Sequence, residues 1–87
     1  MKEQIAINQE VNVTAVYFQN KKELKTFPKC IEYDGNTYTF REGLQYLIRR
    51  GKDIIRIFEM TDGQSNYRLR CNGEETTWTL VNITPVA

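Results

Sequence analysis

The chain has 87 residues, of which 40% are hydrophobic and 26% charged, and its formal net charge is +1. A chain of this length has room for one hydrophobic core, so residues 1–87 are expected to form a single domain. The near-zero net charge gives no general electrostatic attraction to nucleic acid or membranes, and the ordinary charged fraction argues against disorder.

The N-terminal part of the chain predicts one clear strand. Residues 1–9 are polar with isolated apolar side chains, and we expect a loosely ordered end there or an edge strand through Ile5 and Ile7. From residue 11 to residue 19 apolar and polar side chains alternate and β-branched residues are frequent, which is typical of a strand. The charged residues 20–23 predict a turn after it.

Residues 29–40 contain the strongest structural signal in the sequence. Apolar and polar side chains alternate on both sides of the dipeptide Asp34-Gly35. Asp-Gly tolerates positive φ at both central positions of a tight turn, so this stretch predicts a β-hairpin around which the other strands are arranged. Pro28 cannot donate a backbone hydrogen bond, and it therefore marks a sheet edge or the start of this hairpin.

Residues 41–49 fit two patterns. Four apolar residues have the i, i+4, i+7, i+8 spacing of a helix face, namely Phe40, Leu44, Leu47 and Ile48. Two arginines followed by Gly51 resemble the C-terminus of a helix, where cations and glycine are favourable. We therefore expect a short helix near 41–49, with a strand as the alternative because every second residue from Leu44 to Ile48 is also apolar.

Three further strands are expected after this segment. Residues 53–61 carry apolar side chains on both faces, as a central strand or a strand beneath a helix would. Residues 66–71 alternate cleanly, and residues 76–83 are rich in threonine and form the last strand. Turns are predicted at Asp62-Gly63 and Asn72-Gly73, and residues 84–87 are expected to form a loosely ordered end.

These elements predict a mainly β fold, either all-β or α+β. Short, regularly spaced strands joined by Asp-Gly and Asn-Gly turns are typical of a meandering antiparallel sheet. A flat sheet of five or six strands would leave its core exposed in so short a chain. We therefore expect a small curled antiparallel sheet or a partly open barrel of the SH3-like or OB-like type, with one short helix.

The residues that most enzymes and metal sites require are missing. The chain has no histidine, so histidine-based general acid–base catalysis and histidine metal ligation are excluded. The single serine, Ser65, lies in a predicted turn, the two cysteines do not form a Cys-x-x-Cys pair, and the five glycines are scattered. The sequence therefore predicts a protein that is not an enzyme and has neither a cofactor nor a metal site.

A local excess of basic residues indicates a candidate binding surface. Residues 41–70 contain seven basic and four acidic side chains, an excess of +3, whereas residues 1–40 contain five of each. Such a surface suits phosphates, and nearby aromatic rings can stack on bases. The candidate nucleic-acid-binding residues are Arg49, Arg50, Lys52, Arg56, Arg68 and Arg70, with Tyr46 or Phe58 as a stacking surface.

Two alternatives compete with a nucleic-acid module. The arginines can instead form ion pairs with acidic residues on a solvated sheet face. A second hypothesis is a protein-interaction or accessory domain that uses an exposed sheet edge or apolar patch, since strand 53–61 is apolar on both faces and unpaired edges offer backbone groups to a partner strand.

The hairpin and the C-terminal strands together resemble a family of small uncharacterised bacterial β-rich domains. The resemblance covers residues 27–83 and is carried by Pro28, Ile31, Tyr33, Gly35, Tyr38 and Trp78. Tyr33 replaces a tryptophan that is common in the family, and Asn36 replaces an arginine. Some members are encoded beside DNA-repair genes, so the resemblance implies a nucleic-acid or repair-protein context.

The N-terminus predicts an unexported protein. Residues 1–6 contain no apolar run of signal-peptide length, and no later stretch approaches a membrane span, so we expect a soluble, cytoplasmic protein. Cys30 and Cys71 are then expected to be reduced thiols rather than a disulfide, because the cytoplasm is reducing.

Overall fold

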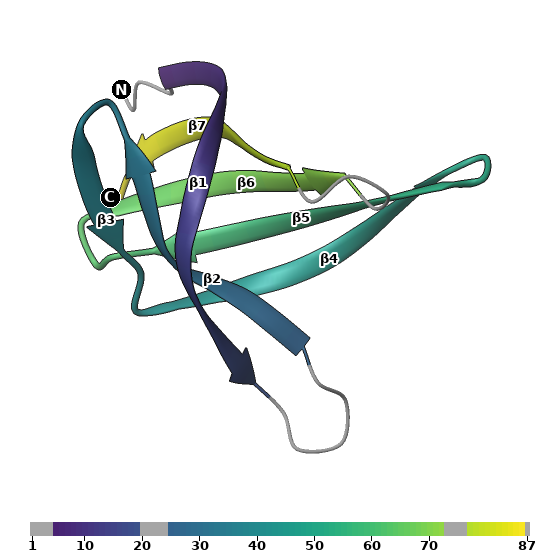
Figure 1. The fold of residues 1–87 in the computed structure, drawn as a ribbon, viewed down its shortest axis with the longest axis horizontal. Coiled ribbons are helices and arrows are strands. Elements are labelled where there is room, and N and C mark those ends of the chain that lie inside the picture. Colours follow the sequence, from purple (N-terminus) through teal and green to yellow (C-terminus); the bar gives the residue numbers. More distant parts are fainter. Residues whose placement is uncertain (1–4, 20–24, 73–76, 87) are drawn as a thin grey trace.

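A computed structural model describes residues 5–19, 25–72 and 77–86. These residues form seven strands and, within the described ranges, no helix (Figure 1). The strands are β1 (Ile5–Gln19), β2 (Lys25–Tyr33), β3 (Asn36–Thr39), β4 (Glu42–Arg50), β5 (Asp53–Thr61), β6 (Ser65–Asn72) and β7 (Trp78–Pro85).

All seven strands belong to one antiparallel sheet with the order β3-β2-β1-β7-β6-β5-β4. β1 joins two halves of this sheet, one made of β2 and β3 and the other of β4–β7. The first part of β1 pairs with β7, and its second part pairs with β2. The sheet is not closed, since β3 and β4 form its two edges. The prediction of a mainly β, antiparallel fold is therefore confirmed.

β1 is long because it turns a corner between the two halves. Its register with β7 shifts between Ala6 and Gln9, where Asn8 has a φ of 52°, and its register with β2 shifts on both sides of Ala15. Such bulges bend a strand and increase its twist. As a result, β1 and β2 run steeply across β4–β7 instead of continuing their plane (Figure 1).

The packing of the two halves on each other creates the core. Phe27 on β2 contacts Phe58 on β5 edge-to-face, with ring centroids 5.7 Å apart, and Phe58 also lies 5.0 Å from the ring of Trp78. Aromatic contacts also link β3 to β6. The buried core consists of Val11, Phe27, Ile31, Phe40, Phe58, Met60, Tyr67, Leu69 and Leu80.

The hairpin predicted at Asp34-Gly35 is confirmed. β2 and β3 pair directly across it, and both turn residues have positive φ, 52° and 77°, as a type I′ turn requires. Pro28 lies in β2 beyond the last pair with β3, Cys30 with Thr39, and is buried beside the bulge in β1. At that position no described strand pairs with the other side of β2, and a residue without an amide proton is tolerated there.

The prediction of a helix near 41–49 is wrong, and so is the count of five or six strands. These residues form β4, which pairs with every residue of β5 from Asp53 to Thr61 without a register shift. Gly51, read as a helix stop, is instead the first central residue of a two-residue hairpin turn, with a φ of 62°. Pairing along a whole neighbouring strand outweighed a weak helical propensity.

Several other expectations concern the ends and turns. Residues 5–9 lie in β1, as the alternative of a strand through Ile5 and Ile7 expected, but β1 lies between β2 and β7 in the sheet order and is not an edge strand. β7 extends to Pro85. The turn predicted at 20–23 and most of the turn at Asn72-Gly73 lie outside the described residues. No described helix could cross a membrane.

Replacing Leu69 with alanine should strongly destabilise the fold. Leu69 is 0% exposed on β6, so truncation removes buried methyl groups and leaves a cavity, at a cost of about 2–5 kcal/mol. The measurement is urea unfolding of dilute protein. Leu44→Ala is the matched control, because Leu44 is 71% exposed and its truncation should change the free energy of unfolding by less than about 0.5 kcal/mol. Equal losses for both variants would contradict this core.

Candidate interaction surface

The hairpin formed by β4 and β5 extends well beyond the rest of the sheet (Figure 1). We call its outer part, residues 44–57, the arm. The arm is rich in apolar side chains that remain in contact with solvent: Leu44 is 71% exposed and Leu47 is 60% exposed. The other exposed large apolar residues of the arm are Tyr46, Ile48 and Ile54. Exposed apolar side chains gathered in this way make the arm a candidate interaction site.

Strand pairing explains why these side chains lie on both faces of the arm. Residues opposite each other in an antiparallel pair share a face, and successive residues alternate. Leu44, Tyr46 and Ile48 are opposite Glu59, Ile57 and Ile55, on the outer face. Leu47 is opposite Arg56 on the inner face, in line with the core residue Phe58 but farther toward the tip. The hydrophobic core therefore does not extend along the arm to its tip.

β4 is also an edge strand. It follows β5 at the end of the sheet order, and no described strand pairs with its other side. In a two-residue hairpin the residues that flank the turn, here Arg50 and Asp53, exchange backbone hydrogen bonds. Because the register is unbroken, the even-numbered amides of β4 point to β5 and the odd-numbered amides, from Gly43 to Arg49, point to the free edge.

The base of the arm is held tightly against the core by Gly43. This glycine is opposite the buried Met60, and a Cβ atom placed on it would overlap the Met60 Sδ and lie 2.7 Å from the carbonyl oxygen of Glu59. Any larger residue would push β4 away from β5 at this point. The absence of a side chain here lets β4 follow β5 closely into the arm.

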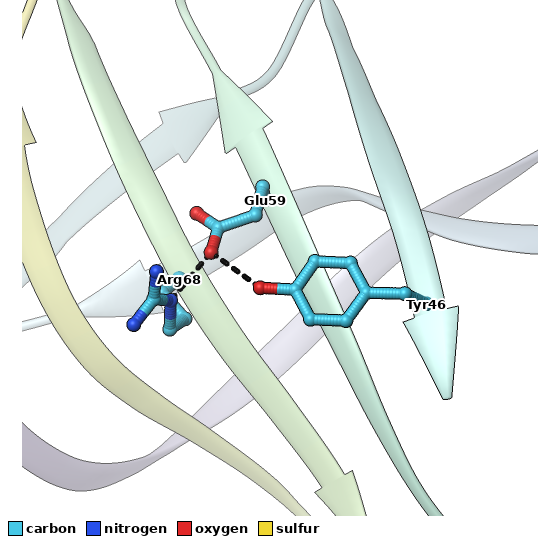
Figure 2. Close-up of polar contacts among 3 residues, drawn as sticks. All are labelled: Tyr46, Glu59 and Arg68. Atoms are coloured by element: carbon cyan, nitrogen blue, oxygen red, sulfur yellow. Dashed lines mark hydrogen bonds and ion pairs between the residues drawn. The ribbon is translucent and has the colours of Figure 1, made fainter. Parts of the chain in front are cut away.

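A polar network lies on the outer face beside the apolar residues (Figure 2). The Tyr46 hydroxyl on β4 donates to Glu59 Oε1 on β5 at 2.8 Å, and Nε of Arg68 on β6 donates to the same oxygen at 2.5 Å. The hydrogen bond that Arg68 donates to Glu59 raises the pKa of Arg68. Partial burial, together with Glu59, raises the pKa of Tyr46 above its ordinary value. Both groups therefore keep their protons at neutral pH, and Arg68 is already engaged by a carboxylate.

The candidate nucleic-acid-binding residues do not form one surface. Arg49, Arg50 and Lys52 lie at or beside the arm's tip and are exposed. Arg56 is opposite Cys71 and so lies on the inner face, whereas Arg68 and Arg70 lie on the outer face of β6. The Nε atom of Arg70 is buried and has no hydrogen-bond partner among the described residues. Of the candidate residues, only those in the arm form an exposed basic group. Phe58, the alternative stacking residue, is buried in the core, so it offers no surface to a base.

A second polar cluster stabilises the turn between β5 and β6. Asp62 Oδ1 accepts hydrogen bonds from the backbone amides of Gln64 and Ser65, both at 2.8 Å, and Oδ2 accepts one from the Tyr67 hydroxyl at 2.8 Å. Burial raises the pKa of Asp62, but these donors outweigh it and the net pKa is lowered. Burial and Asp62 raise the pKa of Tyr67. These hydrogen bonds stabilise the turn between β5 and β6, which is a structural reason for the polar residues of this cluster.

Other kinds of site find little support in the described part of the chain. No three Cys, Asp or Glu side chains there are grouped as metal ligands would be. Cys30 and Cys71 are not joined in a disulfide, and burial raises the pKa of the Cys71 thiol, which lowers its reactivity. No protein-family model, curated protein or solved structure matches this chain.

The exposed apolar residues of β4 were not predicted as a site from the sequence. Their helical spacing suggested a helix that would bury Leu44, Leu47 and Ile48 against the sheet. The apolar residues on both faces of 53–61 could have indicated this site, because a strand of that kind requires other segments to pack against both of its faces. The structure covers only the part of β5 nearest the core.

Replacing Asp62 with asparagine should reduce stability at neutral pH and reduce it less in acid. Because the pKa of Asp62 is lowered in the folded state, its contribution is fully present above the ordinary carboxyl pKa and is lost as the pH falls through the lowered value. The difference from wild type in free energy of unfolding should therefore shrink between about pH 5 and pH 2. Asp34→Asn is the control, since Asp34 is an exposed turn residue. A difference that is constant with pH would contradict the role given to the carboxylate.

Proposed function

We propose that this protein is a non-enzymatic protein-interaction module that binds its partner through the arm. The partner adds a strand to the free edge of β4 and covers the apolar side chains beside it. Main-chain hydrogen bonds to the odd-numbered residues of β4 supply affinity, and the exposed side chains of Leu44, Leu47 and Ile48 supply specificity. The partner's matching segment is extended and carries apolar side chains at alternate positions.

The observation that carries this proposal is the contrast between the two edges of the sheet. β3 has four residues, and most of its side chains are polar, as is common for an edge that avoids other chains. β4 has nine residues, carries no proline, and has apolar side chains through its middle. Proteins usually protect long apolar edges with charge, proline or a covering segment. The middle of β4, from Leu44 to Ile48, has neither a charge nor a proline, and no described strand pairs beside it, so this edge favours an interface.

A second candidate function is nucleic-acid binding by the arm's tip. Residues 49–56 contain four cations, Arg49, Arg50, Lys52 and Arg56, and one acid, Asp53, which gives a local charge of +3. A projecting hairpin with such a tip suits the phosphate backbone or a groove of a duplex. Arg68 and Arg70 lie outside this candidate, since Arg68 is paired with Glu59.

Replacing Leu44 and Leu47 together with glutamate should abolish partner binding and leave the fold intact. Proteins retained by the immobilised wild-type chain are identified, purified and titrated into the isotope-labelled protein. Amide shifts should map to β4 and β5, and the double variant should bind about a hundredfold more weakly, because two apolar contacts are replaced by charges.

Val16→Glu is the matched control for this experiment, because Val16 is 45% exposed on β1, a strand that β7 and β6 separate from β5 and β4 in the sheet order. It should bind the purified partner as the wild type does. A partner that binds the double variant with wild-type affinity, or whose shifts map to β1–β3, would contradict the proposal.

The nucleic-acid candidate predicts salt-sensitive binding at the arm's tip. Short single- and double-stranded DNA and RNA, added to the labelled protein at low salt, should shift the amides of residues 49–56, and the shifts should fade as salt rises because counterions are released. Arg68→Gln should leave this binding unchanged, whereas Arg50→Gln with Lys52→Gln should weaken it. If no amide shifts at low salt, this candidate is rejected.

A further inference from the structure

We infer that the partner of β4 is a second copy of this chain, bound across a two-fold axis through Tyr46 so that the two sheets continue into each other. This inference rests on the proposed function and names the occupant of the same edge. It follows from the order of charges along β4 and from the direction in which two identical strands must pair.

The side chains of β4 are complementary to β4 itself when it is reversed. The strand begins with an acid, Glu42, and ends with two arginines, Arg49 and Arg50, while its middle is apolar on the outer face. Two copies related by a two-fold axis pair antiparallel. If Tyr46 is opposite its own copy, Glu42 is opposite the second copy's Arg50 at both ends of the pair.

The same register also aligns the apolar side chains. Leu44 is then opposite Ile48 of the second copy, twice, and the two Tyr46 rings adjoin at the axis. All of these residues lie on the outer face, in line with Ile55 and Ile57 of β5. The two apolar strips therefore merge into one across the interface, with an oppositely charged pair at each end. Opposite charges and apolar pairs directly across an antiparallel ladder are the stabilising combinations.

The neighbouring symmetric registers are less favourable. A two-fold axis through Gln45 places Glu42 opposite Ile48 and brings Arg41 opposite Arg49, which are like charges. An axis through Leu47 places Leu44 opposite Arg50. Like charges directly opposite each other destabilise a strand pair. The axis through Tyr46 is therefore the register that the charges of β4 select.

The backbone of β4 is compatible with this register. The amides that point to the free edge belong to odd-numbered residues, as described above. With the axis through Tyr46, Gln45 is opposite the second copy's Leu47 and Gly43 is opposite its Arg49, so odd-numbered residues meet odd-numbered residues. Each of these pairs can exchange both backbone hydrogen bonds, and the edge is satisfied along its length.

The test uses sedimentation equilibrium of the 87-residue chain over a wide range of concentrations, with charge-reversed variants. The wild type should associate reversibly to a dimer. Glu42→Arg alone and Arg50→Glu alone should each weaken the dimer about tenfold, because each change creates two like-charged pairs. The double variant Glu42→Arg/Arg50→Glu restores opposite charges and should dimerise as the wild type does.

A mismatched double variant gives the control for register. Glu42→Arg/Arg49→Glu has the same composition of changes, but Arg49 is opposite Gly43 in this register, so it should remain weak. Circular dichroism of each variant verifies that it is folded. If the wild type stays monomeric at every concentration, or if both double variants behave alike, the inference is overturned. If the wild type is monomeric, the proposed function is still tested separately, by the binding experiment with a purified partner that is a different protein.

Discussion

The edge-to-face contact between Phe27 and Phe58 is the interaction on which the rest of this structure depends. It joins the half of the sheet that contains β2 to the half that contains β5, across the only hydrophobic core in the described chain. β1 makes this contact possible, because its bulges turn it from one half into the other. Without that turn, the apolar faces of the two halves would both remain in water.

The position of the core around this contact also determines which part of the β4–β5 hairpin stays exposed to solvent. β4 and β5 are each nine residues long, and the core on β5 includes Phe58 and Met60 near one end. The described residues bury only the part of this hairpin nearest the core, and small domains in general bury a smaller share of their surface. The arm therefore projects with apolar side chains on both faces. This exposed arm is the part of the molecule that we propose binds a partner.

The β2–β3 hairpin could be predicted from the sequence because its cause is local. Asp34-Gly35 fixes the turn, and the turn fixes the register of the strands beside it. The segment 41–49 could not be predicted in this way, since its apolar spacing fits a helix and a strand equally. Pairing with β5 makes this segment a strand instead of a helix. That pairing depends on a tight turn at Gly51, which sequence patterns describe poorly.

The candidate site was predicted only in part for a related reason. Sequence patterns show that Arg56 and Arg68 are on neighbouring strands, but their faces depend on the register of β5 with β6. That register places them on opposite faces, so the basic surface divides. The exposed edge of β4 required knowledge of the complete strand order, which joins residues far apart in the sequence.

Amide hydrogen exchange along β4, measured at low and high protein concentration, tests the central claim most directly. In dilute protein the amides of Leu44, Tyr46 and Ile48 should exchange slowly and those of Gln45 and Leu47 rapidly, because only the first set faces β5. At high concentration Gln45 and Leu47 should become protected as a second copy covers the edge. If these two amides exchange rapidly at every concentration, or slowly even in dilute protein, the account of β4 as a free edge completed by its own copy is contradicted.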